Sequence, residues 1–203
     1  MDEPQRPHRP ALYADLTDMI DAAGGAGPAS RAEIAAATAA LVVHAGRRRE
    51  GETDLVSLAD TVGIDTLAAL WRDADPVSLP GALWAIYLLR QWCRANGEEV
   101  TRFWRAGQPM ADADAAVAGV ADYADIDAVR EVADAVLAGA YQGDFAVALE
   151  RAAALFRVIA TGRRQLAGSE PAAQNENERA RRNERVADGL TAAAARWRAG
   201  TLH

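Results

Sequence analysis

Apolar residues recur along this chain at spacings of three and four, the period of one face of an α-helix. The clearest run extends from Phe145 to Ala160. No segment shows the sustained alternation of apolar and polar residues that marks a half-buried strand. About a quarter of the residues are alanine, which has the highest intrinsic helix propensity. The sequence therefore predicts an all-α fold.

The most apolar of the predicted helices covers residues 79–95. Apolar side chains lie nearly all round it, and its only polar strip is formed by Arg90, Gln91 and Arg94. A helix of this kind is typical of the buried centre of a bundle. We therefore expect an irregular bundle of about nine or ten helices around this central helix.

Glycine and proline residues mark the expected boundaries. Residues 1–10 carry three prolines and are expected to be a flexible lead-in. Residues 11–165 are expected to form the helical bundle, with short helices near 11–23 and 54–62, and the Phe145 helix is expected to end at Thr161-Gly162. Residues 166–203 then form a last helix, which packs on the bundle or on a second copy of the chain.

The charge and the apolar pattern limit the classes of partner. The formal net charge is −7, which disfavours nucleic acid and anionic membrane as partners. The chain has one cysteine, no signal-peptide pattern and no apolar run of the length that crosses a membrane. We expect a soluble cytoplasmic protein.

The residues that usually carry catalysis are few and scattered. The only cysteine, Cys93, lies within the apolar helix and is interpreted as a small buried side chain. The three histidines, His8, His44 and His203, are far apart, so no common zinc site can be assembled. No nucleophile or phosphate-loop motif is present. The sequence predicts no catalytic, metal or cofactor-binding residues, and we expect a protein that is not an enzyme.

Acidic residues gather between positions 112 and 127. Paired carboxylates can hold Mg²⁺, but such sites normally involve a phosphate substrate, and the spacing of a calcium-binding loop is absent. The preferred interpretation is a solvated face with helix N-caps. The residues concerned are Asp112, Asp114, Asp122, Asp125 and Asp127.

Aromatic residues are concentrated between Pro80 and Gly107. Their plainest interpretation is hydrophobic core, but buried indoles need a partner for the N–H group, which leaves room for a polar-lined ligand pocket. The candidate pocket residues are Trp84, Tyr87, Arg90, Trp92, Arg94, Phe103 and Trp104.

The last helix offers a second candidate surface. It is polar at first and then carries an apolar stripe, beside the one locally basic stretch of the chain. The candidate interaction face consists of Arg182, Val186, Leu190 and Trp197.

Three local resemblances bear on function. Leu58–Arg72 resembles the first two helices of a helix-turn-helix, which implies DNA reading by the second helix, although that helix offers few donors for base edges. Tyr141–Leu155 is similar to the turn and second helix of one tetratricopeptide repeat, present once. The segments SLPGALWAIYLLRQW and GDFAVALERAAALFRV resemble uncharacterised helical proteins of high-GC actinobacteria, a resemblance that implies no activity.

Three functional hypotheses follow from these patterns. The first is a non-enzymatic protein-interaction or regulatory module, acting through a protein partner or self-association. The second is a helical domain that binds a small molecule with the aromatic residues of 84–104. The third is a DNA-binding regulator that uses Leu58–Arg72.

Overall fold

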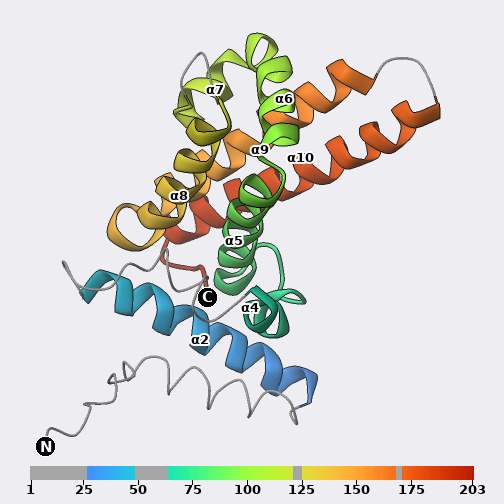
Figure 1. Ribbon diagram of the computed structural model, residues 1–203. Coiled ribbons are helices and arrows are strands. Elements are labelled where there is room, and N and C mark those ends of the chain that lie inside the picture. Colours follow the sequence, from blue (N-terminus) through green and yellow to red (C-terminus); the bar gives the residue numbers. More distant parts are fainter. Residues whose placement is uncertain (1–26, 49–63, 121–124, 168–170) are drawn as a thin grey trace, which may run out of the picture.

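A computed structural model of the protein describes residues 27–48, 64–120, 125–167 and 171–203. Within these residues the chain forms eight α-helices and one short 3₁₀ helix, with no strand (Figure 1). The all-α prediction is therefore confirmed, but the described residues hold fewer helices than the nine or ten expected. The helices expected near 11–23 and 54–62 lie outside the described residues.

Where the connections are described, consecutive helices are joined by short segments. None of the helices in the described segments has both the length and the apolar character needed to cross a membrane. In chain order they are α2 (Pro28–Arg48), α4 (Ile64–Trp71), α5 (Leu79–Ala95), α6 (Gly97–Gly107), the 3₁₀ helix η1 (Gln108–Met110), α7 (Asp112–Ala118), α8 (Ile126–Gln142), α9 (Phe145–Ala167) and α10 (Pro171–Arg198).

Local signals set both ends of α5. The Ser78 hydroxyl accepts a hydrogen bond from the Gly81 backbone N–H at 3.3 Å and caps the first turn. At the other end the Asn96 backbone N–H donates to the carbonyl of Trp92 at 2.8 Å. The helix therefore has the bounds predicted from the sequence, residues 79–95.

The centre of the bundle is α9 rather than α5. α9 lies beside α10 and also packs against α6, α7 and α8 (Figure 1). α5 packs mainly against α8, α2, α10 and α4, and one stripe of its surface stays partly exposed, with Leu88 42% accessible. The prediction of a central helix over 79–95 is thus not supported, because the described residues leave that apolar stripe uncovered.

α9 continues past the expected stop at Thr161-Gly162 and ends at Ala167. The reason is that Gly162 lies where α9 crosses α6. A Cβ atom on Gly162 would be 1.8 Å from the Phe103 carbonyl oxygen, and one on Gly107 would be 2.0 Å from the Val158 carbonyl oxygen. These glycines let two helix backbones touch, so Gly162 serves packing and does not end the helix.

The N-terminal side of the fold is joined through Trp71, at the end of α4. Its indole is fully buried and donates to the Thr38 hydroxyl of α2 at 3.0 Å, and its ring lies 5.8 Å from that of Tyr87 in α5. α4 is the second helix of the resemblance to a helix-turn-helix, and residues 58–63 of that motif lie outside the described residues. Because Leu70 and Trp71 are buried, this end of α4 serves packing.

The last residues of the chain turn back onto the bundle. Gly200 has a φ of 69°, a left-handed conformation that reverses the chain after α10. Leu202 is buried in the core, and the backbone oxygen of His203 accepts a hydrogen bond from the N–H of Leu79 at 2.9 Å. The tail thereby holds the end of α10 against the start of α5.

Candidate functional site

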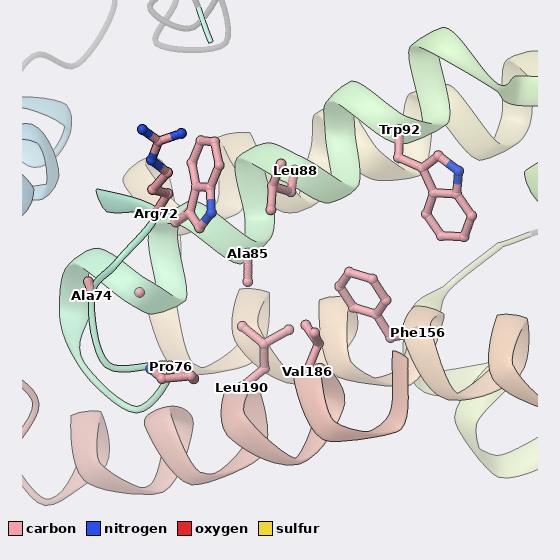
Figure 2. Close-up of a pocket in the computed structure, with 11 residues that line it drawn as sticks. Arg72, Ala74, Pro76, Ala85, Leu88, Trp92, Phe156, Val186 and Leu190 are labelled. Carbon is pink, nitrogen blue, oxygen red and sulfur yellow. The ribbon is translucent and has the colours of Figure 1, made fainter. Parts of the chain in front are cut away.

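An apolar cleft of about 360 Å³ lies between α5 and α10, and it is closed on one side by the turn that follows α4 (Figure 2). In this view Ala85, Leu88 and Trp92 come from α5, while Val186 and Leu190 come from α10 opposite. Its lining residues are Arg72, Ala74, Pro76, Gly81, Trp84, Ala85, Leu88, Trp92, Phe156, Val186 and Leu190.

The α5 wall follows from helical spacing. Trp84, Leu88 and Trp92 are separated by four residues each, so they form one stripe along two turns. Both indoles are only half-buried, and Leu88 is exposed. The stripe is therefore apolar surface that the described part of the chain leaves accessible.

The α10 wall is held in place by close packing on α9. Ala187, Ala193 and Ala194 are buried and let the two helices approach each other. This arrangement turns Val186 and Leu190 toward the cleft, where Phe156 of α9 also contributes its ring (Figure 2). The walls are thus parts of regular helices and not of loops.

The turn after α4 is fixed by Gly81. A Cβ atom at this position would lie 2.1 Å from the carbonyl oxygen of Asp75, so only glycine lets the turn pack on the first turn of α5. The Asp75 carboxylate accepts a hydrogen bond from the Val77 N–H at 2.7 Å and fixes the turn from within. Ala74 and Pro76 are thereby placed against the cleft.

A buried arginine supports the Trp92 end of the cleft. The guanidinium carbon of Arg163 lies 5.2 Å from the Trp92 ring centroid and 4.1 Å from that of Phe103, within the range of cation–π attraction. Arg163 Nη1 also donates to Glu176 of α10 at 2.5 Å. These contacts join α5, α6, α9 and α10 around Trp92 and hold its ring in place.

Arg72 lies at the other end of the cleft (Figure 2). It is exposed, and its guanidinium forms no hydrogen bond or ion pair with any residue that the structure describes. Among the described residues that line the cleft, it is the one with a charged side chain. The cleft is therefore apolar along its length, and Arg72 lies at its mouth with the guanidinium directed away from α10 (Figure 2).

The cleft takes in two of the seven predicted pocket residues, Trp84 and Trp92. The other five lie elsewhere. Tyr87 is buried against Trp71, and the buried Arg90 donates to Asp134 of α8 at 2.5 Å. Arg94 is exposed and reaches the second oxygen of the same carboxylate at 3.5 Å.

Phe103 and Trp104 face the interior instead of the cleft. Phe103 packs under Arg163, and Trp104 is fully buried. The Trp104 indole N–H has no hydrogen-bond partner among the described residues. The aromatic stretch is thus divided: some of its residues belong to the hydrophobic core, and Trp84 and Trp92 line the cleft.

The predicted face of α10 is divided in the same way. Val186 and Leu190 line the cleft. Arg182 points elsewhere and forms an ion pair with Glu178 on its own helix at 2.7 Å. Trp197 packs edge-on against Phe145, with ring centroids 4.7 Å apart. The structure therefore brings the aromatic stretch and the α10 face together at one site.

Sequence reasoning missed several lining residues. Leu88 shares the helical spacing of Trp84 and Trp92, so its place on the stripe was readable from the sequence. Phe156 was readable only as part of the core-facing stripe of α9. Nothing in the sequence indicated that Arg72, Ala74 and Pro76 would line a cleft together with residues of α10.

Cys93, Asp114 and Asp125 have structural roles in the described part of the chain. Burial raises the pKa of the Cys93 thiol to about 12, so the sulfur stays protonated at neutral pH. Asp125 caps α8 by accepting from the Ala128 N–H at 2.8 Å, and Asp114 lies 3.7 Å from Arg157. Within the described segments, no three potential metal ligands lie close enough to share an ion. Asp122 and the His44 side chain fall outside the description.

No family model, curated protein or solved structure matches this chain.

Proposed function

We propose that this chain is a non-enzymatic binding module and that the α5–α10 cleft holds a small apolar ligand. One observation carries the proposal: Trp84, Leu88 and Trp92 line the same concave site as Val186 and Leu190. The cleft volume of about 360 Å³ lies within the range of small-molecule sites, which are mostly apolar and aromatic.

The energetics favour a ligand at this place. Each Å² of apolar surface removed from water contributes about 25 cal/mol to the binding free energy. The half-buried indoles still have exposed apolar surface that a ligand would cover. The walls are helical and are braced by Arg163 and Gly81, so binding would require little ordering of the protein. Pre-formed apolar sites of this kind bind their ligands without a large rearrangement of the protein.

A protein contact is the second candidate, favoured by the exposure of Leu88 at the middle of the stripe. An apolar side chain from a partner helix, or from a second copy of this chain, would enter the same cleft. Sedimentation analysis separates the two ideas. Self-association would give a dimer that Leu88→Glu dissociates, whereas a ligand-binding monomer would sediment identically with and without the substitution.

The DNA-binding alternative stays a prediction without added support. Of the helix expected to read the groove, the described side chains are two alanines and the buried Leu70 and Trp71, followed by Arg72. Major-groove reading depends on side-chain hydrogen-bond donors and acceptors, which this end of α4 supplies only through Arg72.

Binding is tested with N-phenyl-1-naphthylamine, an uncharged aromatic probe whose emission rises in apolar sites. We expect saturable binding with energy transfer from tryptophan, and at least about tenfold weaker binding for Leu88→Glu, which places a charge in the cleft. The matched control is Val147→Glu, at an equally exposed position of α9 (45% accessible) that does not line the cleft. Equal binding by both variants would show that the cleft is not the site.

A further inference from the structure

We infer that the ligand of the α5–α10 cleft is an apolar monoanion, an aromatic or aliphatic acid whose charged end meets Arg72. The inference rests on the proposed function and specifies its ligand. It follows from the hydrogen-bond donors that the lining side chains have and from the acceptors that they lack.

The lining side chains can donate hydrogen bonds but cannot accept them. Only three of the eleven lining residues have polar side-chain atoms: Arg72, Trp84 and Trp92. Guanidinium and indole N–H groups are both donors without acceptor capacity. A ligand that satisfies them must therefore bring acceptors, and it must be apolar over the rest of its surface.

The positions of Arg163 and Arg72 determine how the ligand would be oriented in the cleft. At the Trp92 end, the cation of Arg163 is already engaged by Glu176 and by two aromatic rings. At the other end, Arg72 forms no ion pair with a described residue. An anionic group would therefore sit beside Arg72, with the apolar body lying along the cleft toward Trp92.

Acidic groups lie near Arg72, but outside the cleft. Arg72 also borders an adjoining hollow, whose charged lining residues are Arg31, Asp73, Asp75 and His203. The Asp75 carboxylate accepts a hydrogen bond from the Val77 N–H, and neither aspartate lines the cleft itself. A cationic ligand in the cleft would meet Arg72 with no acidic side chain to balance it, and a ligand rich in donors would leave them unpaired.

The first test compares two probes of nearly the same shape. 1-Anilinonaphthalene-8-sulfonate differs from N-phenyl-1-naphthylamine by its sulfonate group. We expect Arg72→Gln to weaken binding of the sulfonate about tenfold and to leave the uncharged probe unchanged. Arg182→Gln, which removes a charge already paired with Glu178 away from the cleft, should change neither. Cooperative urea unfolding of each variant confirms that it is folded.

A second measurement uses the unaltered protein. Decanoate, decanol and decylamine share one chain length and differ in head group. Decanoate should displace the uncharged probe at a concentration roughly tenfold below that of decanol, and decylamine should be the weakest of the three. If the three displace equally and Arg72→Gln binds both probes normally, the anionic-ligand inference is overturned while the cleft stands as an apolar site. If neither probe binds the unaltered protein, the proposed function itself fails.

Discussion

The hydroxyl of Thr38 links α2 to α4. It accepts from the buried indole of Trp71 at 3.0 Å and lies 2.9 Å from the carbonyl oxygen of Ile34. Thr38→Val keeps the shape but leaves the Trp71 N–H buried without an acceptor. We expect about 1–3 kcal/mol lower free energy of unfolding, measured by urea denaturation. Thr38→Ser retains the hydroxyl and should recover most of that loss. If the Thr38→Val variant were as stable as the wild type, the bond between Trp71 and Thr38 would not contribute to stability.

The ion pair between Glu150 and Arg198 makes stability depend on pH. Two hydrogen bonds of 2.5 and 2.8 Å from the Arg198 guanidinium hold the pKa of Glu150 below its ordinary value of 4.5. A pKa lowered by folding stabilises the native state above the unfolded-state value, and that contribution is lost as pH falls through the lowered pKa.

Glu150→Gln should therefore reduce stability at pH 7 and reduce it less at pH 3, because part of the carboxylate's contribution is lost below its ordinary pKa. Because the pair is partly exposed, we expect a difference of only about 0.5 kcal/mol. Urea unfolding at both pH values measures it, with Glu131→Gln as the control at an exposed site of α8. A loss of the same size at pH 3 would show that the carboxylate charge is not responsible.

Single residues were predictable from sequence where the answer depends on neighbours in the chain. The burial of Cys93 followed from the apolar helix around it, and the capping role of the acidic residues was met by Asp125. The partner of a buried indole was not predictable. Trp71 bonds to a residue 33 positions away, and no local pattern marks that pair.

At the scale of elements, bounds were predictable where local signals decide them. α5 begins after Ser78, whose side chain caps the first turn, and ends before Asn96, whose backbone N–H bonds to the Trp92 carbonyl. The end of α9 was predicted wrongly, since Gly162 has the local character of a helix stop. What keeps it helical is the contact with α6, which depends on tertiary structure.

The α6–α9 crossing predicts opposite effects for two glycine substitutions. Gly162→Ala should destabilise the protein by about 3 kcal/mol, because the added methyl would overlap the Phe103 carbonyl and force the helices apart. Gly139→Ala in α8 meets only the Ala148 methyl at 3.7 Å and should stabilise by up to about 1 kcal/mol through helix propensity. Thermal unfolding of both variants checks the pair; two effects of the same sign would contradict the close crossing.

On the scale of the whole molecule, the cleft is lined by three parts of the chain that are far apart in sequence: residues 72–92, Phe156 and residues 186–190. The sequence indicated two separate candidate surfaces, one on α5 and α6 and one on α10, and the fold places two residues of the first against two residues of the second. Helical periodicity shows which residues share a face of one helix. It does not show which faces of different helices meet, so the place of Arg72 beside the cleft is visible only in the assembled structure.

The tail after α10 connects two distant parts of the fold, because it packs the end of α10 against the start of α5. Leu202 adds its side chain to the core, while His203 contributes a backbone oxygen to Leu79. Leu202→Ala should therefore lower the free energy of unfolding by about 2 kcal/mol, through lost burial and a partly unfilled cavity.

His203→Ala is the matched control, since the His203 side chain is exposed and its backbone bond survives the change. We expect it to unfold at the wild-type urea concentration. The urea dependence of the Leu202→Ala unfolding free energy should keep its wild-type slope, which indicates one cooperative unit. A reduced slope or a second transition would show instead that α10 and the tail unfold independently of α5, and that the cleft between them opens before the rest of the protein.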